Sequence, residues 1–446
     1  MPRKARKGYF MKTFRPKFID TLKGYSKKQL ISDVVAGVIV AIIALPLSIA
    51  LAIASGVSPE RGLYTAIVAG FVIALLGGSR VNISGPTAAF AAIVAGIVAE
   101  QGVEGLAIAT LMAGGMLILM GVLRLGKLIK YIPETITVGF TSGIAVTIVI
   151  GQIKDFMGLT FKEGTVAVEA IEKLEAIAES ITTVNLLAIL TGLAALAILI
   201  LWPKVSKKIP GSLIAVLVLT LAVAISGLKV NTIGGLFNIS ASLPPFTLPA
   251  FDKVNIVELI PDAFTIAILA AIESLLSCVV SDKMIEDTHN SNTELIAQGA
   301  GNICSAIFGG IPATGAIART AANVKNGGRS PVSGIVHAVV LLLVLVVLMP
   351  YAAFIPMPVI AAVLFMVAYN MSEWRHFVKI CKNAPIYETL VLILTFVFTV
   401  IFDLVVAIAV GLALHYAIVL IKRITEKKKA AFEQMSDDSK SEDGGK

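Results

Sequence analysis

The chain has 446 residues, of which 57% are hydrophobic and 15% are charged, and its mean hydropathy is +0.89. A soluble fold cannot bury that much apolar surface, so the composition predicts a polytopic protein embedded in a lipid bilayer. The net charge of +8 does not indicate nucleic-acid binding, because most Lys and Arg lie in the N-terminal tail and in short loops. The three cysteines and four histidines have no metal-ligand spacing and form no catalytic cluster, so we predict no metal site, no bound cofactor and no enzyme.

The chain begins with a basic stretch, residues 1–30, that lacks the apolar core and cleavage site of a signal peptide and predicts a cytoplasmic tail. Fourteen apolar segments follow in two sets of seven: 31–54, 62–77, 86–99, 105–123, 131–152, 184–201 and 211–227, then 260–280, 293–308, 314–325, 332–349, 357–371, 385–401 and 403–421. The polar stretch 422–446 predicts a disordered tail.

The third segment of each set is too short to cross a bilayer. At 1.5 Å per residue, 86–99 is about 21 Å long and 314–325 about 18 Å, whereas the hydrocarbon core is about 30 Å thick. Both segments follow a Gly-Gly pair and a stretch broken by Pro or Gly, so each helix is expected to begin near the midplane. An odd-numbered repeat inserts its second copy upside down. We therefore predict an all-α fold with an inverted 7+7 repeat, in which two short half-helices meet at the midplane.

Positive charges support this topology, because every cluster falls on one side of the membrane. These clusters are Arg80; Arg124, Lys127 and Lys130; Lys204, Lys207 and Lys208; Lys283; Lys325 and Arg329; Arg375, Lys379 and Lys382; and Lys422 with Arg423. The acid-rich loop 154–183 falls on the opposite side. We therefore predict a multi-pass protein of the cell (inner) membrane with both termini in the cytoplasm.

The two short helices predict an anion site. Each helix N-terminus carries about +0.5 charge and unpaired N–H groups. The hydroxyls of Thr87 and Thr314 and the backbone near Ala88 and Gly315 are placed to replace lost hydration. No nucleotide-binding motif is present, so the prediction is secondary transport of a small anion.

Glu273 and Arg319 are charged residues inside predicted segments. An intramembrane acid marks a substrate pathway or a proton relay by default; the alternative is a structural hydrogen bond, or an ion pair with Arg319. Arg319 itself either reaches the anion site or only pins its helix to a neighbour, and the sequence leaves both open.

At these residues the sequence resembles the SulP (sulfate permease) anion transporters, which include the mammalian anion exchangers and prestin. The likeness covers about residues 30–421 and is carried by Asp33–Gly37, Ala44–Ala50, Gly62–Tyr64, Ile83–Ala89, Ala271–Ser277 and Gly310–Thr320. The resemblance implies a uracil-permease-like fold and a homodimer. Within the transport domain 31–421, it implies a core (31–130 and 260–350) that moves against a gate (131–259 and 351–421). The site residues that it implies are Pro46, Ala50, Thr87, Ala88, Glu273, Ser274, Thr314, Gly315, Ala316 and Arg319.

The family usually ends in a cytoplasmic STAS domain, whereas only a short polar tail follows residue 421 here. The leading hypothesis is elevator-like, proton-coupled uptake of C4-dicarboxylates or sulfate, with Glu273 as the proton-coupling residue. The alternatives are a sodium-coupled bicarbonate transporter and an uncoupled anion exchanger or channel, so H⁺ and Na⁺ both stay open as coupling ions. A nucleobase carrier of the same fold is disfavoured by the positive charge at the site.

Overall fold

A computed structural model of the chain describes residues 14–21, 24–127, 133–162, 165, 167–206, 209–402, 406–418 and 420–421. The predicted tail at 422–446 and the first 13 residues lie outside this described part.

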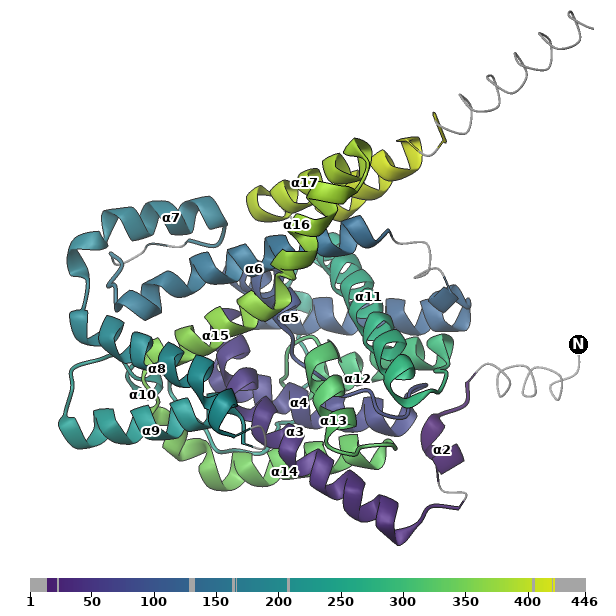
Figure 1. Ribbon diagram of the computed structural model, residues 1–446, viewed down its shortest axis with the longest axis horizontal. Coiled ribbons are helices and arrows are strands. Elements are labelled where there is room, and N and C mark those ends of the chain that lie inside the picture. Colours follow the sequence, from purple (N-terminus) through teal and green to yellow (C-terminus); the bar gives the residue numbers. More distant parts are fainter. Residues whose placement is uncertain are drawn as a thin grey trace, which may run out of the picture. The chain divides into compact units, whose positions relative to one another are not determined.

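Among the described residues, the regular elements of the first half of the chain are helices and one two-residue strand (Figure 1). Its elements are α2 (Lys17–Thr21), α3 (Lys27–Ala54), α4 (Pro59–Leu76), β1 (Ser84–Gly85), η1 (Ala88–Phe90), α5 (Ala91–Val122), α6 (Glu134–Met157), α7 (Ala170–Glu179), η3 (Ile181–Thr183), α8 (Leu186–Val205), α9 (Gly211–Ser226), α10 (Ile233–Leu236) and η4 (Phe251–Lys253).

The second half repeats this pattern, with a short strand before its third helix. Its elements are α11 (Ile260–Ile285), α12 (Ser291–Ile307), β2 (Thr314–Gly315), α13 (Ile317–Lys325), α14 (Val332–Leu348), η5 (Met349–Phe354), α15 (Met357–Met371), α16 (Trp374–Asn383), α17 (Ile386–Ile401) and an unlabelled helix Val406–Ile418.

The predicted segments are confirmed over the described residues, because each of them falls on a helix there; residues 131–132, 403–405 and 419 of two segments lie outside the described part. Within the described residues, eight helices are long and apolar enough to cross a membrane, and three more are apolar but shorter. One of the eight, Ala88–Val122, contains two predicted segments, because Gly102 with φ of 67° interrupts α5 between them. The helices are thus consistent with the 7+7 arrangement.

The two short helices have slightly different bounds from those predicted. The first starts as a 3₁₀ turn at Ala88 and runs to the break at Gly102. The second starts at Ile317 instead of residue 314, because Thr314 and Gly315 are extended and form β2. Both remain too short to span a bilayer.

Helices from the two halves of the chain pack closely. α12 lies along α5 and α4, and α14 lies along α3 and α4. A Cβ on Gly114 of α5 would lie 2.7 Å from the carbonyl oxygen of Gly299 in α12, and one on Gly299 would lie 2.4 Å from that of Gly114. The two glycines therefore allow the backbones to touch, as small residues do between membrane helices.

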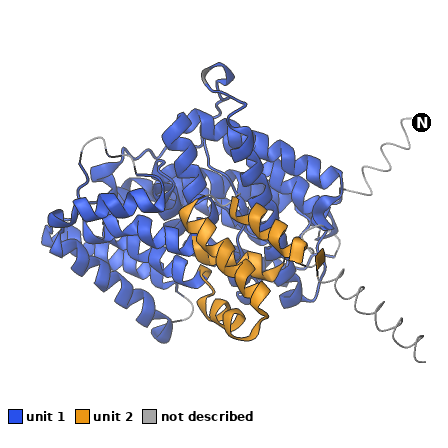
Figure 2. Cartoon of the chain, turned by 90° about the horizontal axis from the view of Figure 1, so that it is seen from above, with its two compact units in different colours: residues 1–130, 144–370 blue, residues 131–143, 371–446 orange. Residues whose placement is uncertain are grey.

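The chain divides into two compact units, shown in Figure 2. One comprises residues 1–130 and 144–370, and the other comprises 131–143 and 371–446. These units reflect how densely segments pack and not which segments move, so the assignment of residues to a core and a gate stays a prediction.

Candidate functional site

The two broken stretches meet in a two-stranded antiparallel bridge. β1 and β2 pair with Ser84 opposite Gly315 and Gly85 opposite Thr314. The N–H of Ala316 adds a 2.8 Å hydrogen bond to the carbonyl of Ile83. Because η1 follows β1 directly and α13 follows β2, this register places the starts of both short helices beside one crossing point.

A buried carboxylate, that of Glu294 in α12, holds the loop that leads into β1. Its side chain is fully buried and accepts five hydrogen bonds of 2.7–3.3 Å. The donors are the N–H groups of Gly78 and Ser79, the side-chain amides of Asn82 and Gln298, and the hydroxyl of Ser274. A buried charge is tolerated only when its lone pairs are satisfied in this way. Glu294 is therefore a structural residue, which fixes where β1 begins.

A buried amide does the same for the loop before β2. The side chain of Asn302 donates to the carbonyl of Ala313 and accepts from its N–H, both at 2.8 Å. The hydroxyl of Thr65 in α4 accepts from the N–H of Ile311 at 2.7 Å. Both non-helical stretches are thus anchored to neighbouring helices by satisfied polar groups, as irregular backbone at membrane depth requires.

Arg319 lies in the first turn of α13 and is only 1% exposed. Its Nη2 donates to the carbonyl of Pro86, just before η1, whereas its Nε and Nη1 have no hydrogen-bond partner. A Cβ on Gly85 would lie 2.6 Å from Nη1, so a larger residue there would have to displace the guanidinium. Arg319 therefore pins the two short helices together, and two of its donor nitrogens have no hydrogen-bond partner within the described structure.

Glu273 in α11 faces the start of the first short helix. The hydroxyl of Thr87 donates a 2.8 Å hydrogen bond to Oε2 of Glu273. No ion pair with nitrogen and oxygen within 4.0 Å joins Glu273 to Arg319 in the part of the chain that the structure describes. Thr87, Glu273 and Ala316 are partly exposed, whereas most of their neighbours in sequence are buried. These three residues thus border the accessible part of the crossing.

The other predicted site residues divide into two groups. Ala88 and Gly315 lie at the crossing itself. Ser274 and Thr314 are fully buried and use their hydroxyls for structure: Ser274 donates to Glu294, and Thr314 donates to the carbonyl of Ala270 at 2.9 Å.

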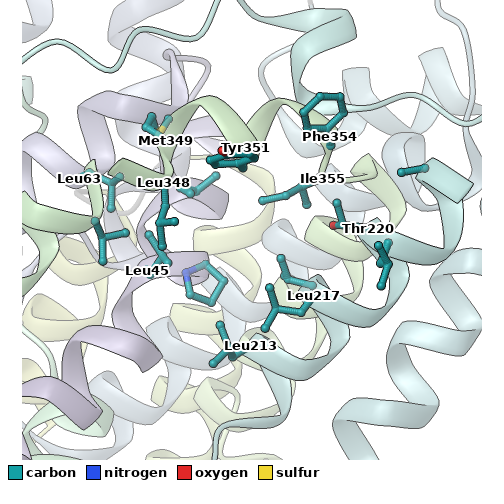
Figure 3. Close-up of a pocket in the computed structure, with 17 residues that line it drawn as sticks. Leu45, Leu63, Leu213, Leu217, Thr220, Leu348, Met349, Tyr351, Phe354 and Ile355 are labelled. Atoms are coloured by element: carbon teal, nitrogen blue, oxygen red, sulfur yellow. The ribbon is translucent and has the colours of Figure 1, made fainter. Parts of the chain in front are cut away.

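Ala50 and Pro46 of α3 complete the predicted set. Ala50 is fully buried. Pro46 lines an apolar cavity of about 490 Å³ between α3, α9 and the α14–η5 segment, together with Leu45, Leu213, Leu217, Leu348 and others (Figure 3). On the α9 side of this cavity, the labelled residue with a hydroxyl group is Thr220 (Figure 3).

With this geometry in place, comparison with known proteins identifies the family. The profile of the sulfate permease family matches residues 30–395. The chain belongs to the sulfate permease family. It is therefore a membrane anion transporter and not an enzyme.

Two curated relatives cover most of the chain. The putative sulfate transporter YvdB of Bacillus subtilis is 45% identical over 421 residues, which are 92% of this chain and 77% of that protein. The bicarbonate transporter BicA of Picosynechococcus is 33% identical over 423 residues, which are 92% of this chain and 73% of that protein.

Solved structures confirm the fold. The transmembrane domain of a cyanobacterial BicA superposes with a TM-score of 0.78 at 34% identity, covering 86% of this chain and 98% of that one. SLC26A9 superposes with a TM-score of 0.85 at 20% identity, covering 95% of this chain and 70% of that one, which shows the fold alone.

Sequence reasoning missed a second buried acid, Asp33, near the start of α3. Asp33 accepts hydrogen bonds from Tyr25 at 2.6 Å, from Gln29 at 3.0 Å and from the N–H of Arg329 at 2.7 Å, and it also accepts from Ser330. Burial, together with the hydrogen bond to Asp33, raises the pKa of Tyr25 to about 12. Asp33 thereby ties the start of α3 to the loop after α13.

Proposed function

We propose that this protein is a secondary active transporter that couples the uptake of sulfate or a C4-dicarboxylate to protons by elevator-like alternating access. The observation that carries the proposal is the Thr87–Glu273 hydrogen bond beside a buried Arg319 that has two unpartnered donor nitrogens. The proposed substrate-binding surface is the crossing bordered by Thr87, Glu273 and Ala316.

The charge at the crossing supports a link between protonation and substrate charge. Arg319 contributes +1, and the two helix starts contribute about +0.5 each. With Glu273 ionised the sum is about +1, which suits a monoanion; with Glu273 protonated it is about +2, which suits a dianion. A dianion and a proton would then enter together. YvdB, named a putative sulfate transporter, supports sulfate as the first substrate to test.

The apolar cavity supports the proposed movement. It lies between α9, from the predicted gate, and α3 and α14, from the predicted core. Its lining is almost wholly aliphatic or aromatic, and the Thr220 hydroxyl there has no hydrogen-bond partner. Helices that meet across an apolar surface can shift past one another without breaking hydrogen bonds, whereas a hydrogen-bonded interface would leave buried polar groups unpaired during such a shift. We further propose a homodimer in the cell membrane with both termini in the cytoplasm, as the distribution of Lys and Arg favours.

The deciding experiment is radiolabelled uptake into proteoliposomes of sulfate, fumarate and bicarbonate, each with and without an inward proton gradient. We expect sulfate or fumarate uptake to rise with the gradient, and Glu273→Gln to abolish that rise. Glu179→Gln, an exposed acid of α7 paired with Lys162, is the matched control and should keep it. A full proton response in Glu273→Gln would overturn the coupling role of Glu273, whereas proton-indifferent uptake would discard coupling but keep anion transport.

A second candidate is sodium-coupled bicarbonate transport. The named function of the BicA relatives and the similarity to the BicA transmembrane domain favour it. In the same assay, an inward sodium gradient would then stimulate bicarbonate uptake, and sulfate would neither be carried nor compete.

A further inference from the structure

Helix α16 differs from every predicted transmembrane segment in length and in pattern. It has 10 residues, so it is about 15 Å long and cannot cross a bilayer. At 3.6 residues per turn, Trp374, Phe377, Val378 and Cys381 fall on one side of the helix. Arg375, Lys379 and Lys382 fall together on the adjacent side, about 100° away. It connects two apolar helices, α15 and α17. A short two-sided helix in this position is typical of the membrane–water interface.

The apolar side is only partly covered within its own unit. The ring of Phe377 packs against that of Phe396 in α17, with centroids 5.5 Å apart. Trp374 is 47% exposed and Val378 is 38% exposed, and no residue of α16 is fully buried. α17 therefore covers one edge of the apolar side and leaves the edge with Trp374 and Val378 open.

The polar side carries three exposed cations that are not neutralised. Among the described residues none of Arg375, Lys379 and Lys382 forms an ion pair, and the helix itself contains no acid. The guanidinium of Arg375 lies 5.5 Å from the centroid of the Trp374 ring, which joins the two sides of the helix. The imidazole of His376 contacts Glu134 of α6 at 3.1 Å, so this side chain faces the protein.

We propose that α16 is a binding site for anionic phospholipids, in which Trp374 and Val378 insert at the acyl boundary while Arg375, Lys379 and Lys382 hold the phosphate headgroups. Charge complementarity selects this occupant, because three free cations beside an open apolar edge match a negative headgroup on an acyl chain. Each cation near an anionic surface contributes about a fivefold preference, so the three together predict about a hundredfold. This inference is independent of the transported substrate.

The chain contains two tryptophans, Trp202 and Trp374, so Trp202→Phe leaves Trp374 as the only indole of the full protein. We would reconstitute this variant in phosphatidylcholine vesicles and add phosphatidylglycerol or phosphatidylcholine with brominated acyl chains, which quench indole fluorescence on contact. Brominated phosphatidylglycerol should quench Trp374 at a mole fraction at least tenfold lower than brominated phosphatidylcholine. In the triple variant Arg375→Gln, Lys379→Gln, Lys382→Gln, the two quenching curves should coincide.

The matched control removes three exposed cations elsewhere, by Lys27→Gln, Lys28→Gln and Lys283→Gln. It should keep the preference for phosphatidylglycerol, and Arg375→Lys alone should keep it as well. Equal quenching by the two lipids in the parent protein would overturn the proposal. So would a complete lack of quenching, which would mean that a protein partner covers α16, or loss of the preference in the control, which would mean that bulk surface charge is responsible.

Discussion

The hydroxyl of Thr87 donates a 2.8 Å hydrogen bond to Oε2 of Glu273, and it does so at the start of the first short helix. This bond joins helix α11 to the first half of the chain at the crossing, as does the 2.7 Å hydrogen bond from the hydroxyl of Ser277 to Asn82 just before β1. Protonation of Glu273 would therefore change the acceptor of the Thr87 hydrogen bond, and loss of the Thr87 hydroxyl would change the environment of the Glu273 carboxyl group. This contact is the first one to test.

Removing the donor should impair transport. A hydrogen bond to a charged group contributes about 1.5–3 kcal/mol, so Thr87→Val should lower the initial rate of uptake at low substrate concentration about tenfold or more. Thr87→Ser keeps the hydroxyl and should stay within about twofold of the parent protein. Uptake of wild-type rate in Thr87→Val would show that the hydrogen bond has no part in transport.

Gly85 tests the position of the Arg319 guanidinium without touching its charge. A Cβ at Gly85 would lie 2.6 Å from Nη1, so Gly85→Ala must displace the guanidinium or β1. Overpacking of this kind costs about 1–3 kcal/mol, and we expect initial uptake rates to fall about tenfold.

Gly115→Ala in α5 is the control for Gly85→Ala, because nothing lies within 4 Å of the Cβ it would introduce. It should leave uptake unchanged and stabilise the helix slightly. If the two alanine variants transported equally well, the close fit around Arg319 would be irrelevant to function.

The architecture was predictable because its signals are local. Long apolar runs mark the segments, and Gly-Gly pairs followed by Pro or Gly mark the two short helices. The Thr87, Glu273 and Arg319 side chains stood out for the same reason, as polar groups in apolar sequence. The register that pairs Ser84 with Gly315 could not be predicted, because the pairing of two-residue strands is fixed by long-range contacts that leave no pattern in the sequence.

Two other features were missed for physical reasons. Glu294 lies in the first turn of α12, whose N-cap is Asn290. An acid in that position is usually exposed and interacts favourably with the helix dipole, so the sequence does not indicate that Glu294 is buried. Three of the ten residues of α16 are Arg or Lys, so a search for apolar runs interprets it as a loop, although its spacing is helical. Sequence patterns thus located the charged groups of the site but not the groups that hold its backbone.

Glu294 should dominate stability. Glu294→Gln replaces one carboxylate oxygen by an amide donor, which then faces a group that is itself a donor: the N–H of Gly78 at the Oε2 position, or the amide of Asn82 at the Oε1 position. Leaving these buried groups unsatisfied should destabilise the fold by about 3 kcal/mol or more, seen as a marked drop in the thermal midpoint of the detergent-solubilised protein. Glu179→Gln, which breaks only an exposed ion pair, should change the midpoint little. Equal midpoints for the two variants would contradict the structural role of Glu294.

Tyr25 should make the stability of the fold sensitive to alkaline pH. Burial and the hydrogen bond to Asp33 raise its pKa from 10.0 to about 12, so the folded protein holds the phenolic proton more tightly than the unfolded chain does. The contribution of this proton is complete below pH 10 and is lost as the pH rises through 12. Tyr25→Phe removes a hydrogen bond to a carboxylate and should cost about 2 kcal/mol near neutral pH.

The difference in thermal midpoint between the parent protein and Tyr25→Phe should therefore shrink between pH 10 and pH 12. Tyr351→Phe is the control, because Tyr351 is 65% exposed and should show no difference at any pH. The Tyr25 hydroxyl donates to Asp33, and Asp33 in turn accepts from the N–H of Arg329 in the loop after α13, so losing the Tyr25 hydroxyl should weaken this connection to the second short helix. If the difference in thermal midpoint between the parent protein and Tyr25→Phe stayed constant up to pH 12, the hydrogen bond from the Tyr25 hydroxyl to Asp33 would not contribute to stability.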